Sequence, residues 1–231
     1  MANPTDVDKQ KRAAAEAAAA LVKDGMIVGL GSGSTSAFAV DALGKRVAQG
    51  LKFVGIPTSE STAAQARTYN ISLSTLNVHP RIDLAIDGAD EVEKGTLNLI
   101  KGRGGALLRE KIVASSSSRF IVIVDESKPV DRLGAHFAVP VEVDQFGWTA
   151  TATKLESLGC KTSLRRGADG MEYVTDGKNY ILDCSFGLIA DSRALAREID
   201  GVVGVVEHGL FPGMASRVLI AGSNGVQTLE P

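Results

Sequence analysis

The feature that most constrains the fold is a repeated order of short apolar runs, turns and helical stretches, which begins at Met26. Strands are expected at 26–30, 52–56, 83–86 and 120–124, and helices at 34–48, 59–69 and 106–116. The apolar runs lack strict polar–apolar alternation, which indicates strands buried on both faces. This order predicts an α/β fold with a Rossmann-like, mostly parallel sheet and helices on both faces.

The pattern changes after Pro129. Strands are expected at 139–143, 161–166 and 202–207, helices at 149–158 and 192–199, and a hairpin over 171–184 that turns at Asp176-Gly177. The order β-α-β-β-α-β is typical of a small ferredoxin-like α+β domain. We predict a Rossmann-like domain of residues 1–133 and 207–231, which a strand at 217–221 rejoins, and a ferredoxin-like domain of residues 134–206.

Composition narrows the classes of partner. Twenty-five Lys and Arg against 27 Asp and Glu give a formal charge of −2, without the basic field expected for nucleic acid or an anionic membrane. The two cysteines, Cys160 and Cys184, are too few for a disulfide scaffold, which favours a reducing cytoplasm. No segment approaches the ~20 apolar residues of a membrane span, and the Ala-rich stretch at 9–22 is predicted to be a packed amphipathic helix.

The first loop suited to a ligand is G-S-G-S-T at 31–35, between the first strand and the first helix of the alternating pattern. Glycines let the backbone approach a ligand, and hydroxyl and N–H groups at a helix N-terminus donate to phosphate. The third glycine of a dinucleotide fingerprint would fall at Ser36, and no P-loop lysine follows. The loop therefore favours a single phosphate. The alternative is a tight turn with Ser34 as the helix N-cap.

The second loop is D-G-A-D-E at 87–91, directly after a strand. Two carboxylates three residues apart then lie at the carboxyl edge of a parallel sheet, where ligands of this architecture bind. An Asp-Gly turn with a solvated acidic helix start explains the same residues at least as well. The ligand spacing of a calcium loop is absent.

The third loop is K-G-R-G-G at 101–105, which leads into a helix and offers N–H groups and a lysine to developing negative charge. Within that helix, Glu110 projects among Leu107, Val113 and Ala114 at 100° per residue. A partly desolvated carboxylate there would suit a general base. With Leu108 and Ile112 in the core instead, Glu110 would lie on an exposed face, and the projection leaves the two interpretations nearly even.

Other signals are weaker. Lys128 ends D-E-S-K at 125–128 and is expected either at the same sheet edge or simply exposed. His79, His136 and His208 are isolated in the sequence, so no metal cluster or histidine relay is indicated.

Four motifs in this order and spacing closely resemble type A ribose-5-phosphate isomerase: G-S-G-S-T at 31–35, D-G-A-D-E at 87–91, K-G-R-G-G-A-L-L-R-E-K at 101–111 and D-E-S-K at 125–128. The resemblance extends from Lys11 to the final strand. It implies an aldose–ketose isomerase of the non-oxidative pentose phosphate pathway, which interconverts D-ribose 5-phosphate and D-ribulose 5-phosphate through an enediol or enediolate. It also implies a homodimer or a dimer of dimers.

The resemblance assigns roles to particular residues. Glu110 is the catalytic base, Asp87 helps to open the furanose ring, Lys101 stabilises the enediolate oxygen, and Asp90 belongs to the same catalytic group. The implied substrate-binding residues are Ser32, Gly33, Ser34, Thr35, Asp87, Gly88, Ala89, Asp90, Lys101, Gly102, Arg103, Gly104, Lys128 and Lys11. Many relatives have glycine where Arg103 stands, so a substrate contact by this side chain is an open question.

This chemistry needs no redox cofactor, since no net electrons move, and no metal if a lysine and amides stabilise the oxygen. Two other classes compete with the enzyme. A non-catalytic sugar-phosphate sensor could share the sheet and the phosphate loop, but would normally carry an N-terminal helix-turn-helix, and 25 residues precede Met26. A dinucleotide-dependent oxidoreductase is disfavoured by the mismatch of the first loop.

Overall fold

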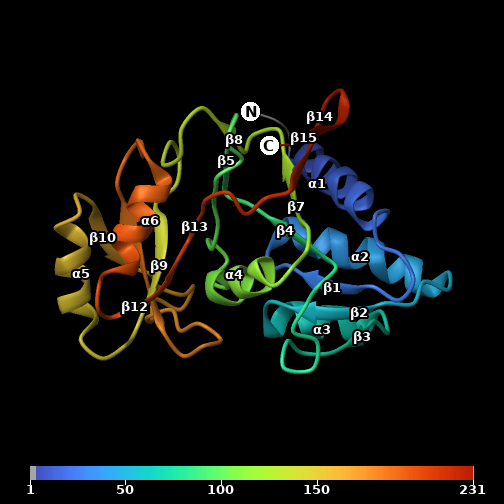
Figure 1. The fold of residues 1–231 in the computed structure, drawn as a ribbon, viewed down its shortest axis with the longest axis horizontal. Coiled ribbons are helices and arrows are strands. Elements are labelled where there is room, and N and C mark those ends of the chain that lie inside the picture. The colour runs from blue at the N-terminus through green and yellow to red at the C-terminus, as the bar shows by residue number, and fades with distance from the viewer. Residues whose placement is uncertain (1–3, 231) are drawn as a thin grey trace. The chain divides into compact units, whose positions relative to one another are not determined.

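The computed structural model describes residues 4–230, which divide into two compact units (Figure 1). The first contains the described residues up to Ala89, Arg109–Lys128 and the chain from Met214 onward. The second contains Asp90–Leu108 and Pro129–Gly213. The sequence-based division, by contrast, assigns residues 90–108 to the Rossmann-like domain and begins the second domain at 134.

A seven-stranded sheet forms the centre of the first unit, in the order β15-β14-β7-β4-β1-β2-β3. Only the β14–β15 pair of this sheet is antiparallel. The strands are β1 (Ile27–Leu30), β2 (Val54–Pro57), β3 (Ser72–Leu73), β4 (Leu84–Gly88), β7 (Phe120–Asp125), β14 (Arg217–Gly222) and β15 (Gly225–Leu229). The mostly parallel sheet is confirmed, as is the prediction that a late strand rejoins it.

Helices cover both faces of this sheet, as predicted. They are α1 (Pro4–Ala19), α2 (Ser34–Ala48), α3 (Glu60–Thr68) and α4 (Leu107–Ser115). Helices α1 and α2 lie side by side (Figure 1), and their buried alanines, together with Leu43 of α2, share one core with Val28 and Leu30 of β1. Side chains alternate along a strand, so Gly29 faces the opposite side. A Cβ there would lie 2.5 Å from Cγ1 of Val113, which places α4 closely against that face.

The second unit contains a four-stranded antiparallel sheet in the order β10-β11-β9-β12. Its elements follow the chain order β9 (Val139–Val143), α5 (Trp148–Glu156), β10 (Lys161–Leu164), β11 (Tyr180–Ser185), α6 (Ser192–Asp200) and β12 (Val205–His208). Residues of both helices and of all four strands share one core. This connectivity and strand order confirm the ferredoxin-like α+β part of the predicted fold.

The predicted hairpin over 171–184 is wrong in its first arm. Strand β11 pairs with β10 instead, and the first arm contributes one isolated bridge between Arg166 and Glu172. The Asp169 carboxylate accepts the Met171 N–H at 3.0 Å, which takes a backbone donor that a strand would need. The predicted turn is present, since the Thr175 N–H donates to the carbonyl of Asn179 across it.

Four very short strands form a second sheet in this unit, in the order β13-β6-β5-β8. They are β5 (Glu91–Glu93), β6 (Leu99–Ile100), β8 (Pro129–Val130) and β13 (Leu210–Phe211). Strands of two or three residues carry too short a pattern to be recognised in the sequence. Their pairing explains why residues 90–108 and 129–133 cluster with the second unit.

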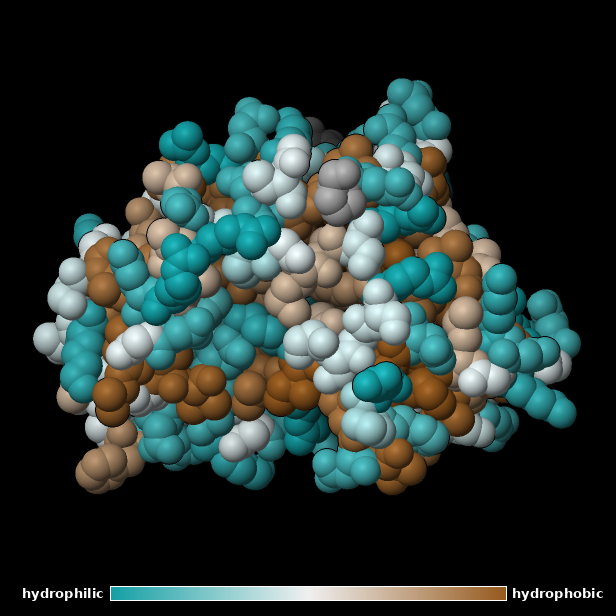
Figure 2. All heavy atoms as spheres, in the orientation of Figure 1, coloured by the Kyte–Doolittle hydropathy of each residue, from teal (hydrophilic) through white to brown (hydrophobic). Residues whose placement is uncertain are grey.

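None of the described helices is long and apolar enough to cross a membrane. On the face that Figure 2 shows, hydrophobic residues lie in separate groups among hydrophilic ones.

Candidate active site

Asp87 and the loop that follows β1 form one hydrogen-bonded arrangement in the first unit. The Asp87 side chain is buried at the end of β4, and its Oδ1 accepts hydrogen bonds from the Ser36 hydroxyl at 2.8 Å and from the N–H groups of Gly88 and Ser32 at 2.8 and 3.1 Å. Strands β1 and β4 are parallel neighbours, so their carboxyl ends meet at one sheet edge. The structure thereby brings the first and second sequence motifs together.

Gly31 is required for this approach. A Cβ at Gly31 would lie 2.1 Å from Oδ1 of Asp87, well inside van der Waals contact. The neighbour is a short carboxylate already fixed by three hydrogen bonds, so it cannot move aside without losing them.

We therefore expect Gly31→Ala to lower the free energy of unfolding by about 1–3 kcal/mol, as overpacking does. Displacement of Asp87 should also lower kcat/KM at least about tenfold, or about 1.4 kcal/mol. Urea unfolding and steady-state kinetics measure the two effects. Gly201→Ala is the matched control, because a Cβ at Gly201 meets only ordinary contacts, the nearest at 3.4 Å. Equal behaviour of the two variants would contradict this role of Gly31.

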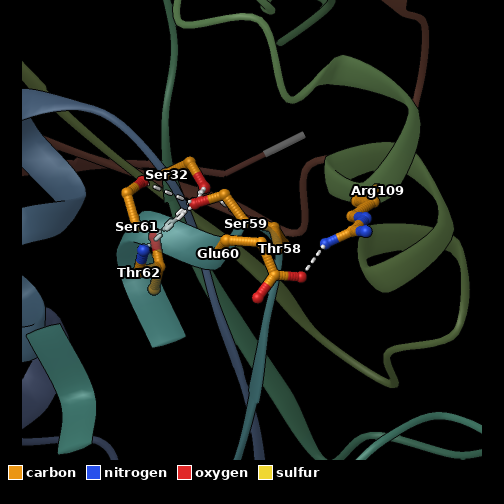
Figure 3. Close-up of polar contacts among 7 residues, drawn as sticks. All are labelled: Ser32, Thr58, Ser59, Glu60, Ser61, Thr62 and Arg109. Carbon is orange, nitrogen blue, oxygen red and sulfur yellow. Dashed lines mark hydrogen bonds and ion pairs between the residues drawn. The ribbon is translucent and has the colours of Figure 1, made fainter. Parts of the chain in front are cut away.

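The Ser32 hydroxyl points into a cluster of other hydroxyls (Figure 3). Its Oγ lies 2.7 Å from Oγ of Ser59, 2.7 Å from Oγ1 of Thr58 and 3.1 Å from Oγ1 of Thr62. Ser59 is also the N-cap of α3, where its Oγ accepts the Thr62 N–H at 3.1 Å. The Ser32 side chain therefore holds the loop in place through hydrogen bonds to other residues of the protein. Its main effect on ligand binding is to fix the position of the loop.

The N-terminus of α2 is the exposed part of the same loop. Gly33 is the N-cap, with φ 95° and no side-chain cap, so the alternative of Ser34 as the N-cap is wrong. Glycine allows this left-handed conformation without steric cost. Gly33 and Ser34 are exposed, and the Ser34 Oγ accepts a hydrogen bond from Nζ of Lys11 at 3.1 Å. Uncapped N–H groups and a nearby lysine suit a phosphate.

Glu110 is buried, with 4% of its surface exposed, on the sheet-facing side of α4. Val113, one turn later, packs over Gly29 and is 4% exposed, whereas Ile112 is 44% exposed. Residues three apart share a helix face. The structure thus decides between the two projections in favour of a desolvated carboxylate. The preceding residue, Arg109, forms an ion pair of 2.9 Å with Glu60 of α3 (Figure 3).

Lys128 follows the carboxyl end of β7, the strand that neighbours β4. It is half-buried, and its N–H donates to the carbonyl of Asp125 at 3.2 Å. The Asp125 carboxylate also accepts the N–H of Ser127 at 3.0 Å, which makes this turn compact. Of the two alternatives that the sequence leaves open for Lys128, the structure favours the same edge of the sheet as Asp87.

The glycine loop belongs to the second unit. Lys101 is 2% exposed, its N–H donates to the carbonyl of Gly209 at 2.9 Å, and its Nζ lies 5.5 Å from the centre of the Phe211 ring. The Asp90 carboxylate accepts the N–H of Arg103 at 3.0 Å, so the structure joins Asp90 to this loop. The Arg103 guanidinium lies 4.8 Å from the centre of the Phe137 ring, a cation–π contact.

The predicted residues thus form two groups, one in each unit. The first unit holds Lys11, Ser32, Gly33, Ser34, Thr35, Asp87, Gly88, Ala89, Glu110 and Lys128. The second unit holds Asp90, Lys101, Gly102, Arg103 and Gly104. Two motifs are divided by the unit boundary, which falls between Ala89 and Asp90 and between Leu108 and Arg109.

Sequence reasoning missed the residues that support these loops. Thr58, Ser59 and Thr62 come from P-T-S-E-S-T at 57–62, directly after β2. Its signal was a second run of hydroxyls at the carboxyl end of a neighbouring strand.

Within residues 4–230, the one group of side chains close enough to hold a metal is Asp200, Glu207 and His208. The Nδ1 of His208 accepts the Leu210 N–H at 3.1 Å, so Nε2 carries the proton and faces the Asp200 carboxylate at 3.2 Å. Both ring nitrogens of His208 therefore have hydrogen-bond partners within the protein. This group contains none of the predicted site residues.

Polar loops at the carboxyl edge of a mostly parallel sheet are typical of the α/β enzymes that act on small molecules. A family model described as ribose 5-phosphate isomerase A (phosphoriboisomerase A) matches residues 54–225, and the chain belongs to this family.

Individual proteins are similar to this chain, in sequence or in structure, over nearly its full length. Ribose-5-phosphate isomerase A of Synechococcus sp. (strain JA-3-3Ab) is 59% identical over 96% of this chain and 97% of its own length. That of Gloeobacter violaceus is 57% identical over 98% of each. The solved structure of ribose 5-phosphate isomerase A from Methanocaldococcus jannaschii superposes with a TM-score of 0.93 at 42% identity, over 97% of this chain and 99% of that one. A D-ribose-5-phosphate isomerase solved in complex with phospho-erythronic acid gives 0.94 at 38% identity, with the same coverage.

Proposed function

We propose that this chain isomerises D-ribose 5-phosphate to D-ribulose 5-phosphate, and the reverse, with Glu110 as the base. The observation that carries the proposal is the burial of Glu110 on the sheet-facing side of α4, in a chain of the ribose 5-phosphate isomerase A family. Burial of a charge is costly, and a desolvated carboxylate suits the role of a general base.

In the proposed mechanism, Glu110 takes the proton from C2 of the open-chain aldose and returns it to C1. The electrons of the C2–H bond form the C1–C2 double bond of the enediolate, while negative charge develops on the former carbonyl oxygen. A proton then passes from the C2 hydroxyl to that oxygen. The C2 oxygen re-forms a carbonyl while the electrons of the C1–C2 double bond take the proton from Glu110 at C1, which gives the ketose. General acid–base catalysis contributes about 10²–10⁴-fold, so stabilisation of the oxygen by Lys101 and backbone N–H groups supplies much of the remainder.

The other residues bind the substrate. The N-terminus of α2, with Gly33, Ser34 and Thr35, is proposed to hold the phosphate, because its N–H groups carry partial positive charge. Lys11 and Lys128 add positive charge at that end. Ser32, Gly88 and Ala89 shape the loops that surround the ligand.

The carboxylates are proposed to act on the sugar hydroxyls. Asp87 assists the opening of the furanose ring, and its fixed Oδ1 keeps the carboxylate oriented. Asp90 holds the glycine loop through Arg103 and contacts the substrate. Gly102 and Gly104 present backbone N–H groups, and Arg103 borders the site from its position over Phe137.

An isomerase assay of the purified protein tests the function. We expect conversion of ribose 5-phosphate to ribulose 5-phosphate with and without a chelator, and no conversion of ribose, which lacks the phosphate. Phospho-erythronic acid is expected to compete with the substrate. Inactivity toward ribose 5-phosphate would contradict the function, and a loss of activity with the chelator would contradict the metal-free mechanism.

We also propose a cytoplasmic homodimer or dimer of dimers. The near-neutral charge and the scarcity of cysteine support the compartment, and size-exclusion chromatography with light scattering measures the assembly.

A further inference from the structure

The glycine loop of the second unit has a conformation that few sequences can adopt. Gly102 has φ 100° and Gly105 has φ 83°, both in the left-handed region that favours glycine. A Cβ at Gly105 would lie 2.2 Å from the Tyr173 hydroxyl oxygen, so Tyr173 packs directly on the loop. Such a loop needs partners to keep its peptide groups in a fixed direction.

Arg165, directly after β10, supplies those partners. Its Nη1 donates to the carbonyl oxygens of Gly102 at 2.9 Å and of Arg103 at 3.0 Å. Its Nε donates to Oδ2 of Asp183 at 3.0 Å, and its Nη2 donates to the other carboxylate oxygen. Two edges of one guanidinium thus join two successive loop carbonyls to a carboxylate on β11.

Asp183 keeps the guanidinium in place. Asp183 lies opposite Ser163 in the β10–β11 register, so both residues of the pair stand on rigid strands or next to them. The Arg165 side chain is 13% exposed. A bidentate pair fixes the plane of the guanidinium, which a lysine, as a point charge, cannot do.

The direction of the two carbonyls determines the direction of two N–H groups. In a planar trans peptide, the N–H points opposite to the C=O of the preceding residue. Holding the Gly102 carbonyl therefore aims the Arg103 N–H, which donates to Asp90. Holding the Arg103 carbonyl aims the Gly104 N–H, which has no acceptor among residues 4–230.

A cavity lies beside the residues that hold the loop. Asp90, Arg103, Arg165 and Asp183 all line one cavity of about 350 Å³. Gly104 is exposed, so its N–H, which points away from the Arg165 guanidinium, is accessible to an acceptor on a bound molecule.

We propose that Arg165, held by Asp183, is a positioning residue that aims the Gly104 N–H at an oxygen of the substrate and fixes Asp90 through Arg103. This inference rests on the proposed function. In this inference, the Arg165–Asp183 pair of the second unit orients the glycine loop for the reaction. Neither side chain needs to contact the substrate.

Kinetics of Arg165→Ala give the first test. We expect kcat to fall at least about tenfold, since a misdirected oxyanion donor loses transition-state stabilisation, while KM changes less than threefold because the phosphate-binding residues lie in other loops. Arg165→Lys should not restore kcat, whereas added methylguanidinium should partly restore Arg165→Ala. Arg166→Ala is the matched control, because Arg166 contacts Gly170 and Glu172 and no residue of the glycine loop.

Amide NMR gives a second test that does not depend on turnover. In the wild type, phospho-erythronic acid should shift the Gly104 and Ser34 amide signals. In Arg165→Ala, the Ser34 shift should remain and the Gly104 shift should be lost. An unchanged kcat in a folded Arg165→Ala, or an unshifted Gly104 amide in the wild type, would overturn the inference, while an inactive wild type would instead refute the proposed function.

Discussion

Glu110→Gln is expected to lower kcat by at least about a hundredfold, the effect of losing a general base. Glutamine has nearly the same size and shape as glutamate, but its amide cannot take up the proton from C2. Because Glu110 is 4% exposed, a neutral amide should not reduce folding stability. KM and the affinity for phospho-erythronic acid should change little, since Glu110 is not assigned to phosphate binding.

The control for this variant is Glu198→Gln on α6, an exposed position in the second unit. It makes the same chemical change and should leave kcat unaltered. Steady-state kinetics and inhibitor titration of both variants separate loss of chemistry from loss of binding. Turnover near that of the wild type in Glu110→Gln would remove Glu110 from the role of base.

The orientation of Glu110 illustrates what a sequence pattern can and cannot decide. Helical projection left a buried and an exposed Glu110 nearly even, because apolar residues lie on both sides of it. The decision depends on Gly29, whose missing side chain lets Val113 approach β1. That contact joins residues 84 positions apart, so no local pattern contains it.

The fold was predictable where patterns are long. The seven expected elements of the alternating region from Met26 to Val124 all have counterparts in the structure, because buried parallel strands and amphipathic helices have distinct periods. The two- and three-residue strands of the small sheet, such as β6 and β13, were missed. Tertiary contacts, not local patterns, determine how these strands pair. Their pairing places residues 90–108 in the second unit.

The supports of the candidate site were the least predictable part. Asp87 and Lys101 stand in recognisable motifs, whereas Arg165 and Asp183 stand in strand positions with no motif of their own. Their role follows from the β10–β11 register and from contacts with a loop about 60 positions earlier in the chain. The residues proposed to bind a ligand therefore left a signal in the sequence, and the residues that hold those loops did not.

Lys101→Met should lower kcat by about 10²–10³-fold, the cost of removing one donor to a developing oxyanion. Methionine retains the unbranched apolar stem, and Lys101 is 2% exposed, so the variant should pack in the same space. The stem would still lie against Phe211, while the charge 5.5 Å from the ring centre would be absent. Because the charge is proposed to act mainly on the enediolate, kcat should fall more than KM rises.

Lys94→Met, in the same unit, is the control for this loss of charge. Lys94 is exposed and pairs with Asp131 at 2.9 Å, so its removal should have little effect on turnover or on the melting temperature. Circular dichroism and thermal unfolding verify that both variants are folded. If a folded Lys101→Met kept more than about a tenth of the wild-type kcat, the oxygen would have to be stabilised by the backbone N–H groups of the glycine loop alone. The positioning of those groups by Arg165 would then carry a larger share of catalysis than the lysine.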